Sequence, residues 1–586
     1  MVALRCQSLV GAGGRALFSL SRTRALRPSP LQTSCQCLQL HLFPRRSRFV
    51  AFCCETSVIA PVQPRKIFME NSIHISTLEE KIFDTLKAVL IHFELKTQLR
   101  VAGGWVRDKL LGKESHDIDI ALEDMHGKSF CERVNEYLMS INEETKHYCV
   151  IQSNPDQSKH LETARMKVFG VEIDFVNLRA ENYAEESRIP TMKFGSAKED
   201  AYRRDLTINS LFYNINTGLI EDFTGRGLSD LRNGVIATPL PPKTTFLDDP
   251  LRVLRAIRFA ARFNYKIQEE LKVAAMDVDV GTALEKKVSP ERVGVEIDLM
   301  MTGADPVRAI QELIDVNIFW IILRLPQELE DEITDSVKRS CLGALIAMMK
   351  VLAVFGPDKL TTDQRRLALY SALFLPFKSF KVTEKKRQVP LTHSLIKHSL
   401  KLKTHDALMV TQIHEAADEF NHIWKVLFDE ENGNINNSNQ GARDWELTSR
   451  SEKMIRAGFW MGNIKELWRV ALVLHALLDV ITCTDLGDTE VKQRAGKCLA
   501  AEAAIMELGL EDIWNVKPLL DGKKIMSALG LEKGIPGMKE WQNHVRKWQL
   551  CHMTATAEEC YEWLKDEYQH KRQSPLKMEE LSVHIP

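Results

Sequence analysis

The segment from Val101 to Leu122, VAGGWVRDKLLGKESHDIDIAL, restricts the possible folds more than any other part of the chain. It places Gly103 and Gly104 after a short apolar run, then helix-forming residues, and then Asp117-Ile-Asp119. In a strand, side chains two positions apart point to the same face, so Asp117 and Asp119 would present two carboxylates side by side. The order strand, Gly-Gly turn, helix and acidic strand predicts a small α+β unit.

Two carboxylates at this spacing favour a cation site, because like charges so close together are costly unless they are neutralised. Mg²⁺ prefers one or two carboxylates together with substrate phosphates, and two such ions can clamp an in-line phosphoryl transfer. Gly-Gly lets a triphosphate approach the backbone closely, and Arg107 is placed to contact phosphate. An ordinary turn and a solvated acidic strand would explain either element alone, but not the ordered combination.

The rest of the chain divides into two patterns. Further strand-like runs at 163–169, 171–178 and 210–214 alternate with helical segments up to about residue 240. After Leu247 the spacing of apolar residues is helical almost throughout, beginning with LRVLRAIRFAARF at 251–263, and a polar, Asn-rich stretch at 429–444 interrupts it. We therefore expect an α+β part followed by an all-α part.

Several motifs then resemble one family in the same order along the chain. GGWVRD followed by DIDIAL is similar to the polymerase-β-type nucleotidyltransferases, specifically the class II CCA-adding tRNA nucleotidyltransferases and the related bacterial-type poly(A) polymerases. Later matches are VEIDFVNLR, DAYRRDLTINSLFYN (200–214), FLDDPLRVLRAIRFAARF (246–263) and SPERVGVEI (289–297). The resemblance covers about residues 98–300. It implies a head with a mixed five-stranded sheet and helices, followed by an all-α neck, body and tail.

The resemblance also implies domain limits and residue roles. The expected domains are a leader (1–66), the catalytic head (67–240), a base-selecting neck (241–320), a body (321–440) and a tRNA-binding tail (441–586). The implied catalytic residues are Asp117, Asp119 and Asp174, of which Asp117 and Asp119 also hold the metals. The implied nucleotide-binding residues are Gly103, Gly104, Arg107, Arg179, Arg203, Arg204, Asp205, Asn209, Asp249 and Arg252.

Asp249 and Arg252 match the base-selecting motif of the family, here DDxxR with Asp248 in place of Glu. A carboxylate accepts from the amino group shared by cytosine and adenine, and a guanidinium donates to the neighbouring ring nitrogen. Uracil and guanine would leave both groups unpaired, which a buried site penalises strongly. A surface Asp–Arg pair on a helix is the alternative interpretation.

The implied activity is the addition of C, C and A to the 3′ end of tRNA from CTP and ATP, with Mg²⁺ and pyrophosphate release. The tRNA would be held by its 3′ end and its acceptor and T arms, and Lys523 and Lys524 lie in a segment (517–564) that resembles the tail module. A bacterial-type poly(A) polymerase shares all the head motifs and remains an alternative. An RNA-binding protein without catalysis would predict a broken Asp-x-Asp. No membrane span and no obligate protein partner are implied.

The first residues differ from the rest of the chain. Residues 1–54 contain eight arginines, many serines and no acidic residue before Glu55, which is typical of a mitochondrial or plastid transit peptide. A disordered, basic RNA-binding tail is the alternative. The leader resembles those of plant members of the family, and an internal start at Met69 would give a product in the cytoplasm or nucleus. Without residues 1–66 the net charge is about −10, so any RNA-binding surface must be local.

Overall fold

The computed structural model describes residues 72–151, 163–182, 191–329, 331–428, 448–479, 486–531 and 537–573. The predicted leader and the Asn-rich stretch at 429–444 lie outside these ranges. Residues 63–586 form one unit, so the predicted limits between head, neck, body and tail stay predictions. Among the described residues no helix combines the length and the apolar character that a membrane crossing requires.

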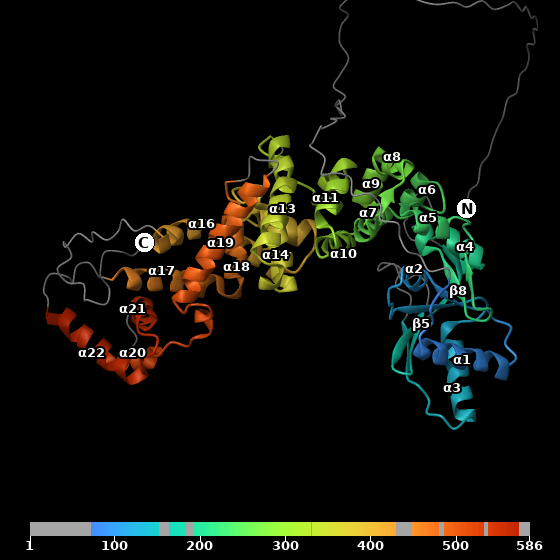
Figure 1. Ribbon diagram of the computed structural model, residues 1–586, viewed down its shortest axis with the longest axis horizontal. Helices are drawn as coiled ribbons and strands as arrows, with labels where there is room; N and C mark the ends of the chain where they lie inside the picture. Colours follow the sequence, from blue (N-terminus) through green and yellow to red (C-terminus); the bar gives the residue numbers. More distant parts are fainter. Residues whose placement is uncertain are drawn as a thin grey trace, which may run out of the picture. The chain divides into compact units, whose positions relative to one another are not determined.

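A mixed sheet forms the first part of the fold, as predicted (Figure 1). Its strand order is β3-β4-β5-β2-β1-β8-β9, and β2 and β5 pair in parallel while the other neighbours are antiparallel. The strands are β1 (Leu99–Ala102), β2 (Ile118–Leu122), β3 (Tyr148–Ile151), β4 (Thr163–Val168), β5 (Val171–Asn177), β8 (Phe212–Asn214) and β9 (Leu219–Glu221).

The prediction of five strands was wrong, because the sheet has seven. The additional strands include β3 and β9, which lie at the two edges. Neither edge strand contains a fully buried residue. An edge strand with no buried face lacks the apolar alternation by which a strand is recognised in a sequence.

Helices cover the sheet and extend the head. Helix α3 (Gly127–Ser140) packs on β4 and β5, and α1 (Thr77–His92) packs on α3. Helix α1 begins at a capping box formed by Ser76 and Glu79. The Glu79 carboxylate also accepts from Trp105 Nε1 (2.9 Å) and Lys109 Nζ (2.9 Å) of α2 (Gly104–Leu110). This buried carboxylate therefore fixes the helix that follows Gly-Gly against the first helix.

The remaining elements up to residue 236 connect the sheet to the helical part. They are β6 (Arg179–Asn182), β7 (Thr191–Phe194), α4 (Ala197–Tyr202), the 3₁₀ turn η2 (Thr207–Asn209), α5 (Gly227–Asn233) and β10 (Val235–Ile236). Strands β6 and β7 pair with each other, and β10 pairs in parallel with β11 (Lys266–Ile267).

The second part is mainly helical, as predicted. Its helices are α6 (Pro242–Asp248), α7 (Leu251–Phe263), α8 (Glu269–Ala275), α9 (Val278–Lys287), α10 (Pro290–Met301), α11 (Pro306–Asp315), α12 (Ile318–Leu323), α13 (Asp335–Phe355), α14 (Thr362–Leu373), α15 (Leu391–Ser394), α16 (Thr404–Phe428), α17 (Ser449–Ile464), α18 (Trp468–His475), α19 (Asp488–Glu507), α20 (Gly522–Ala528), α21 (Met538–Cys551) and α22 (Ala557–Gln573).

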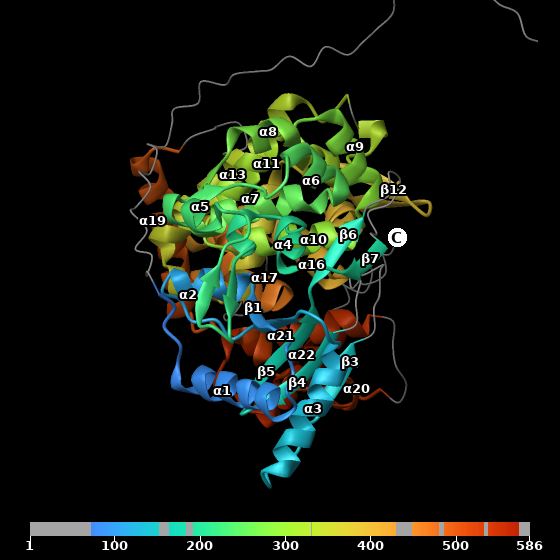
Figure 2. The ribbon, with the colours of Figure 1, turned by 90° about the vertical axis from the view of Figure 1, so that its right-hand side faces the viewer.

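This part is not purely α-helical, however. The β10–β11 pair closes against α7, and a hairpin of β12 (Lys381–Glu384) and β13 (Arg387–Pro390) interrupts the helices (Figure 2). Each of these strands has at most four residues, too few to establish a period of two against the surrounding helical spacing.

Three apolar clusters support these elements within the described residues, and the one with the fewest members lies in the head and contains Leu178 and Phe212. Of the other two, one runs from the head through α19. A smaller one joins α20, α21 and α22, where Trp548 is 6% exposed and stacks on Trp563 with ring centroids 5.1 Å apart. The C-terminal segment therefore has its own core, and Trp548 serves that core.

Candidate active site

Strand pairing brings the three predicted catalytic carboxylates together. The parallel register of β2 and β5 sets Asp119 opposite Asp174, and Asp117 directly precedes β2. Burial raises the pKa of Asp119, and the charges of Asp117 and Asp174 raise it further, to about 6, although Arg204 and Arg165 act in the opposite direction. The cluster therefore carries more negative charge than the protein neutralises.

Arg165 neutralises one member of this cluster. Its Nε and Nη2 donate to the two oxygens of Asp174 at 2.6 and 2.7 Å, across the β4–β5 pair. Sequence reasoning did not identify Arg165, although the hairpin around Phe169-Gly170 would have placed it opposite Asp174. Because Asp174 already has a cationic partner, Asp117 and Asp119 are the two carboxylates most suited to a metal ion. No three His, Cys, Asp or Glu side chains are arranged for a metal within the described residues, so substrate oxygens would have to complete the coordination.

Glycine is required at position 103 for two reasons. Its φ is +70°, which favours glycine. A Cβ on Gly103 would also lie 2.7 Å from Arg204 Nη1. Arg204 Nη1 donates to the backbone oxygen of Asn209 at 3.1 Å, and the charge of Arg204 acts on Asp119. Among the predicted arginines, Arg204 therefore lies close to the Gly-Gly turn and its charge also acts on Asp119.

A buried carboxylate that sequence reasoning missed holds the two motif arginines. Asp200, on α4, is 1% exposed. Its Oδ1 accepts from Arg203 Nε at 2.8 Å and its Oδ2 from Arg204 Nη2 at 2.8 Å, while the Arg179 backbone N–H donates to Oδ1 at 3.2 Å. Burial alone would raise the pKa of Asp200, but Arg203 and Arg204 lower it to about 2. Asp200 lies three and four residues before Arg203 and Arg204, a spacing at which side chains on a helix can pair, so the sequence did contain a signal for these contacts.

Two predicted nucleotide-binding residues are bonded within the protein. Arg107 is 4% exposed, and it donates to the Asp108 carboxylate at 2.8 and 2.9 Å and to Asn209 Oδ1. Asp205 accepts from Asn209 Nδ2 at 3.2 Å and from Arg255 Nε at 2.6 Å. Burial would raise the pKa of Asp205, but the nearby charge of Arg255 lowers it to about 2. Contact of Arg107 or Asp205 with nucleotide stays a prediction that would require these bonds to be exchanged.

The predicted base-selecting residues lie at the junction of α6 and α7. Arg252 donates to the Arg203 backbone oxygen at 2.7 Å and to the Thr245 backbone oxygen at 3.4 Å. Asp249 is held by Arg292 of α10, through Nη2–Oδ2 and Nη1–Oδ1 distances of 2.7 and 3.3 Å. The structure thus joins the DDxxR and RRD motifs. The segment SPERVGVEI contains Arg292 but gives no sign of this contact, because no local pattern connects positions 43 residues apart.

Helix α7 contacts the head through a row of arginines. Arg255 pairs with Asp205, Arg262 reaches Asp108 at 3.6 Å, and Arg258 pairs with Glu296 of α10 at 2.6 Å. The side chains recur every three or four residues, so they lie along one face of α7.

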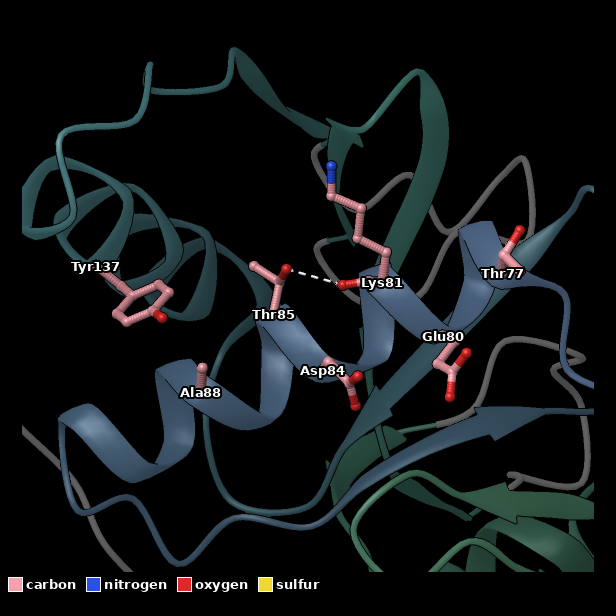
Figure 3. Close-up of a pocket in the computed structure, with 7 residues that line it drawn as sticks. All are labelled: Thr77, Glu80, Lys81, Asp84, Thr85, Ala88 and Tyr137. Carbon is pink, nitrogen blue, oxygen red and sulfur yellow. Dashed lines mark hydrogen bonds between the residues drawn. The ribbon is translucent and has the colours of Figure 1, made fainter.

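Other candidate positions lie away from this cluster. Lys523 and Lys524 are exposed in the first turn of α20. A surface depression on α1, lined by six of its residues and by Tyr137 of α3, contains none of the predicted site residues (Figure 3). Its Thr85 hydroxyl donates to the Lys81 backbone oxygen (2.8 Å). The depression therefore supplies no part of the candidate site.

We predict that Asp119→Asn stabilises the ligand-free protein. The folded-state pKa of about 6 lies above the ordinary 3.8, so the charged form costs stability at pH above 6 and the cost vanishes below pH about 4. A shift of two units corresponds to at most about 3 kcal/mol, and screening at this partly exposed site reduces the expected gain to about 2 kcal/mol at pH 7.5. Urea unfolding at pH 7.5 and near pH 4 measures the difference, and a variant less stable at pH 7.5 would contradict it.

Comparisons with known proteins show the family to which the chain belongs. Residues 99–237 match the family model described as the poly A polymerase head domain. The chain is 36% identical to the tRNA nucleotidyltransferase cca2 of Schizosaccharomyces pombe, over 85% of this chain and 99% of the relative. It is 34% identical to the mitochondrial CCA tRNA nucleotidyltransferase of Saccharomyces cerevisiae, over 80% and 87%. The fold resembles the Bacillus stearothermophilus CCA-adding enzyme crystallised with CTP, with a TM-score of 0.55 at 16% identity, covering 85% of this chain and 99% of that one. The chain therefore belongs to the tRNA nucleotidyltransferase family, whose relatives match both its sheet-containing head and most of its helical part.

Proposed function

We propose that this protein completes the 3′ end of tRNA by adding C, C and A from CTP and ATP, with release of pyrophosphate. The observation that carries the proposal is that one connected cluster contains both the acidic pair and the turn with Asp249 and Arg252, to which we assign base selection. The charge of Arg204 acts on Asp119, Arg204 shares the Asp200 carboxylate with Arg203, and the Arg203 backbone oxygen accepts from Arg252. An enzyme that transfers a selected nucleotide needs its metal-binding carboxylates and its base-binding residues close enough to hold the same nucleotide.

The acidic pair fits Mg²⁺. Asp117 is exposed next to Asp119. Burial, together with the charges of Asp117 and Asp174, raises the pKa of Asp119, and a bound cation would favour its ionised form. Bound Mg²⁺ would neutralise the charge on the reacting phosphate and lower the pKa of the attacking 3′-hydroxyl. Asp117 and Asp119 would hold it, while Arg203 and Arg204 would orient the triphosphate beside Gly103 and Gly104.

Asp249 and Arg252 would choose the base. The carboxylate would accept from the amino group of cytosine or adenine, and the guanidinium would donate to the neighbouring ring nitrogen. Arg292 holds the carboxylate from a different helix, so it fixes the direction in which Asp249 accepts. Lys523 and Lys524, exposed on α20, would contact tRNA phosphates.

The purified protein should add C-C-A and nothing further to a tRNA that lacks these three residues. With CTP alone it should add two residues, and Asp117→Ala should lower the rate about a thousandfold because one of the two metal-holding carboxylates is lost. Primer extension on sequencing gels measures both. Open-ended addition of A without CTP would support a poly(A) polymerase, addition of A only to tRNA ending in C-C would indicate a more limited enzyme, and tRNA binding without extension would indicate an inactive protein.

Arg292→Lys should reduce base selection. Lysine keeps the charge but cannot form the bidentate contact, so Asp249 loses its fixed orientation. We expect the ratio of kcat/KM for CTP to that for UTP to fall about 10- to 100-fold. The matched control is Arg339→Lys, because Arg339 is exposed on α13. An unchanged ratio in Arg292→Lys would show that Arg292 does not serve selection.

We also propose that residues 1–66 direct the protein to mitochondria, chloroplasts or both, and that initiation at Met69 supplies the cytoplasm or nucleus. The arginine-rich, acid-free start of the leader supports this, as does the name of the S. cerevisiae relative. A fluorescent protein fused to residues 1–66 should enter organelles, whereas the chain from Met69 should not. Arg22→Glu with Arg24→Glu should abolish import, and import of the chain from Met69 would contradict the assignment.

A further inference from the structure

The β12–β13 hairpin turns through two lysines in a backbone conformation that lysine disfavours. Glu384 pairs with Arg387, so Lys385 and Lys386 form a two-residue loop. Their φ angles are +48° and +68°. Two-residue hairpin loops with positive φ at both positions are the type that strongly prefers Asn-Gly, because the Cβ of most other residues crowds the backbone there and Asn tolerates this conformation better. The chain keeps two lysines where a more stable choice is available.

The hairpin also presents a local concentration of positive charge. Lys381, Lys385, Lys386 and Arg387 are all exposed. The acidic residue of the hairpin, Glu384, is paired with His398 at 3.1 Å. The chain without its leader has a net charge of about −10, so this cluster is opposite in sign to the protein that carries it. Backbone strain that is retained at an exposed, positively charged tip indicates that these charges serve contact with another molecule rather than stability.

The hairpin is anchored to the helix that serves base selection. The chain after β13 continues into the π-helical turn η6 (Leu395–Ser399), which packs on α10. At this contact a Cβ on Gly294 would lie 1.7 Å from the backbone oxygen of Leu400. Arg292, two residues earlier on α10, holds Asp249. The segment that follows the hairpin therefore packs on the same helix that holds Asp249.

We propose that the hairpin tip, Lys385–Arg387, is a contact site for the phosphate backbone of the tRNA substrate. This inference rests on the proposed function. Three adjacent cations on a two-stranded ribbon suit phosphates rather than bases, because lysine acts as a point charge and carries no sequence information. The contact would hold the body of the tRNA while its 3′ end grows.

The decisive variant is Lys385→Asn with Lys386→Gly. It removes two charges and supplies the residues that the turn prefers, so binding and stability should change in opposite directions. We expect the thermal midpoint to rise and the Kd for tRNA lacking C-C-A to increase about 5- to 20-fold near 0.1 M salt. The slope of log Kd against log salt should fall by about two. The kcat at saturating tRNA should stay unchanged.

Two further variants separate charge from turn geometry. Lys385→Arg with Lys386→Arg keeps the charge and should retain wild-type Kd. Arg387→Gln lies outside the loop and should lower the salt slope by about one. Unchanged Kd and salt slope in the Asn-Gly variant, with C-C-A addition intact in the wild type, would overturn the hairpin contact alone. Absence of C-C-A addition in the wild type would instead overturn the proposed function.

Discussion

The buried carboxylate of Asp200 is the interaction on which the candidate site depends. It binds two guanidinium groups and one backbone N–H. Without it, Arg203 and Arg204 would repel each other in a space where neither is well solvated. Removing one partner of such a buried cluster destabilises the fold by more than the whole cluster stabilises it, because a buried charge is left without a partner. The position of Arg204 next to Gly103 follows from this arrangement, as does the position of the Arg203 backbone that receives Arg252.

Helix α7 also depends on arginines paired with carboxylates, and these pairs join the head to the helical part. Its arginines meet acidic residues on both sides, in Asp205 and Asp108 of the head and in Glu296 of α10. Phe259 and Phe263 lie beneath the Arg107 guanidinium, with centroid distances of 5.1 and 4.9 Å. Apolar packing and paired charges thus share one helix, which explains why its sequence alternates arginine with large apolar residues.

Much of this could be predicted from the sequence because its signals are local. The Gly-Gly turn, the acidic pair and helix α7 at 251–263 each occupy one short segment with a clear period. The partners that complete the site are not local: Arg165 and Arg292 reach their carboxylates only after strands pair and helices pack. Charge alone did not distinguish them from the other arginines. The edge strands β3 and β9 and the β12–β13 hairpin were missed because short, half-exposed strands have little apolar pattern. For Arg107 the sequence predicted the location near Gly-Gly but not the bonding. Its guanidinium nitrogens donate to Asp108 and Asn209 within the protein.

The approach of Gly294 to Leu400 has a consequence for how the sequence can vary. At this point a helix and a crossing segment touch backbone to backbone, with no side chain between them to adjust. Alanine, the smallest possible replacement, would force the two segments apart, whereas much larger changes on the exposed face of α10 would disturb nothing. A single methyl group at residue 294 would therefore be transmitted as a displacement of Arg292, and so reach the Asp249 carboxylate without contacting it.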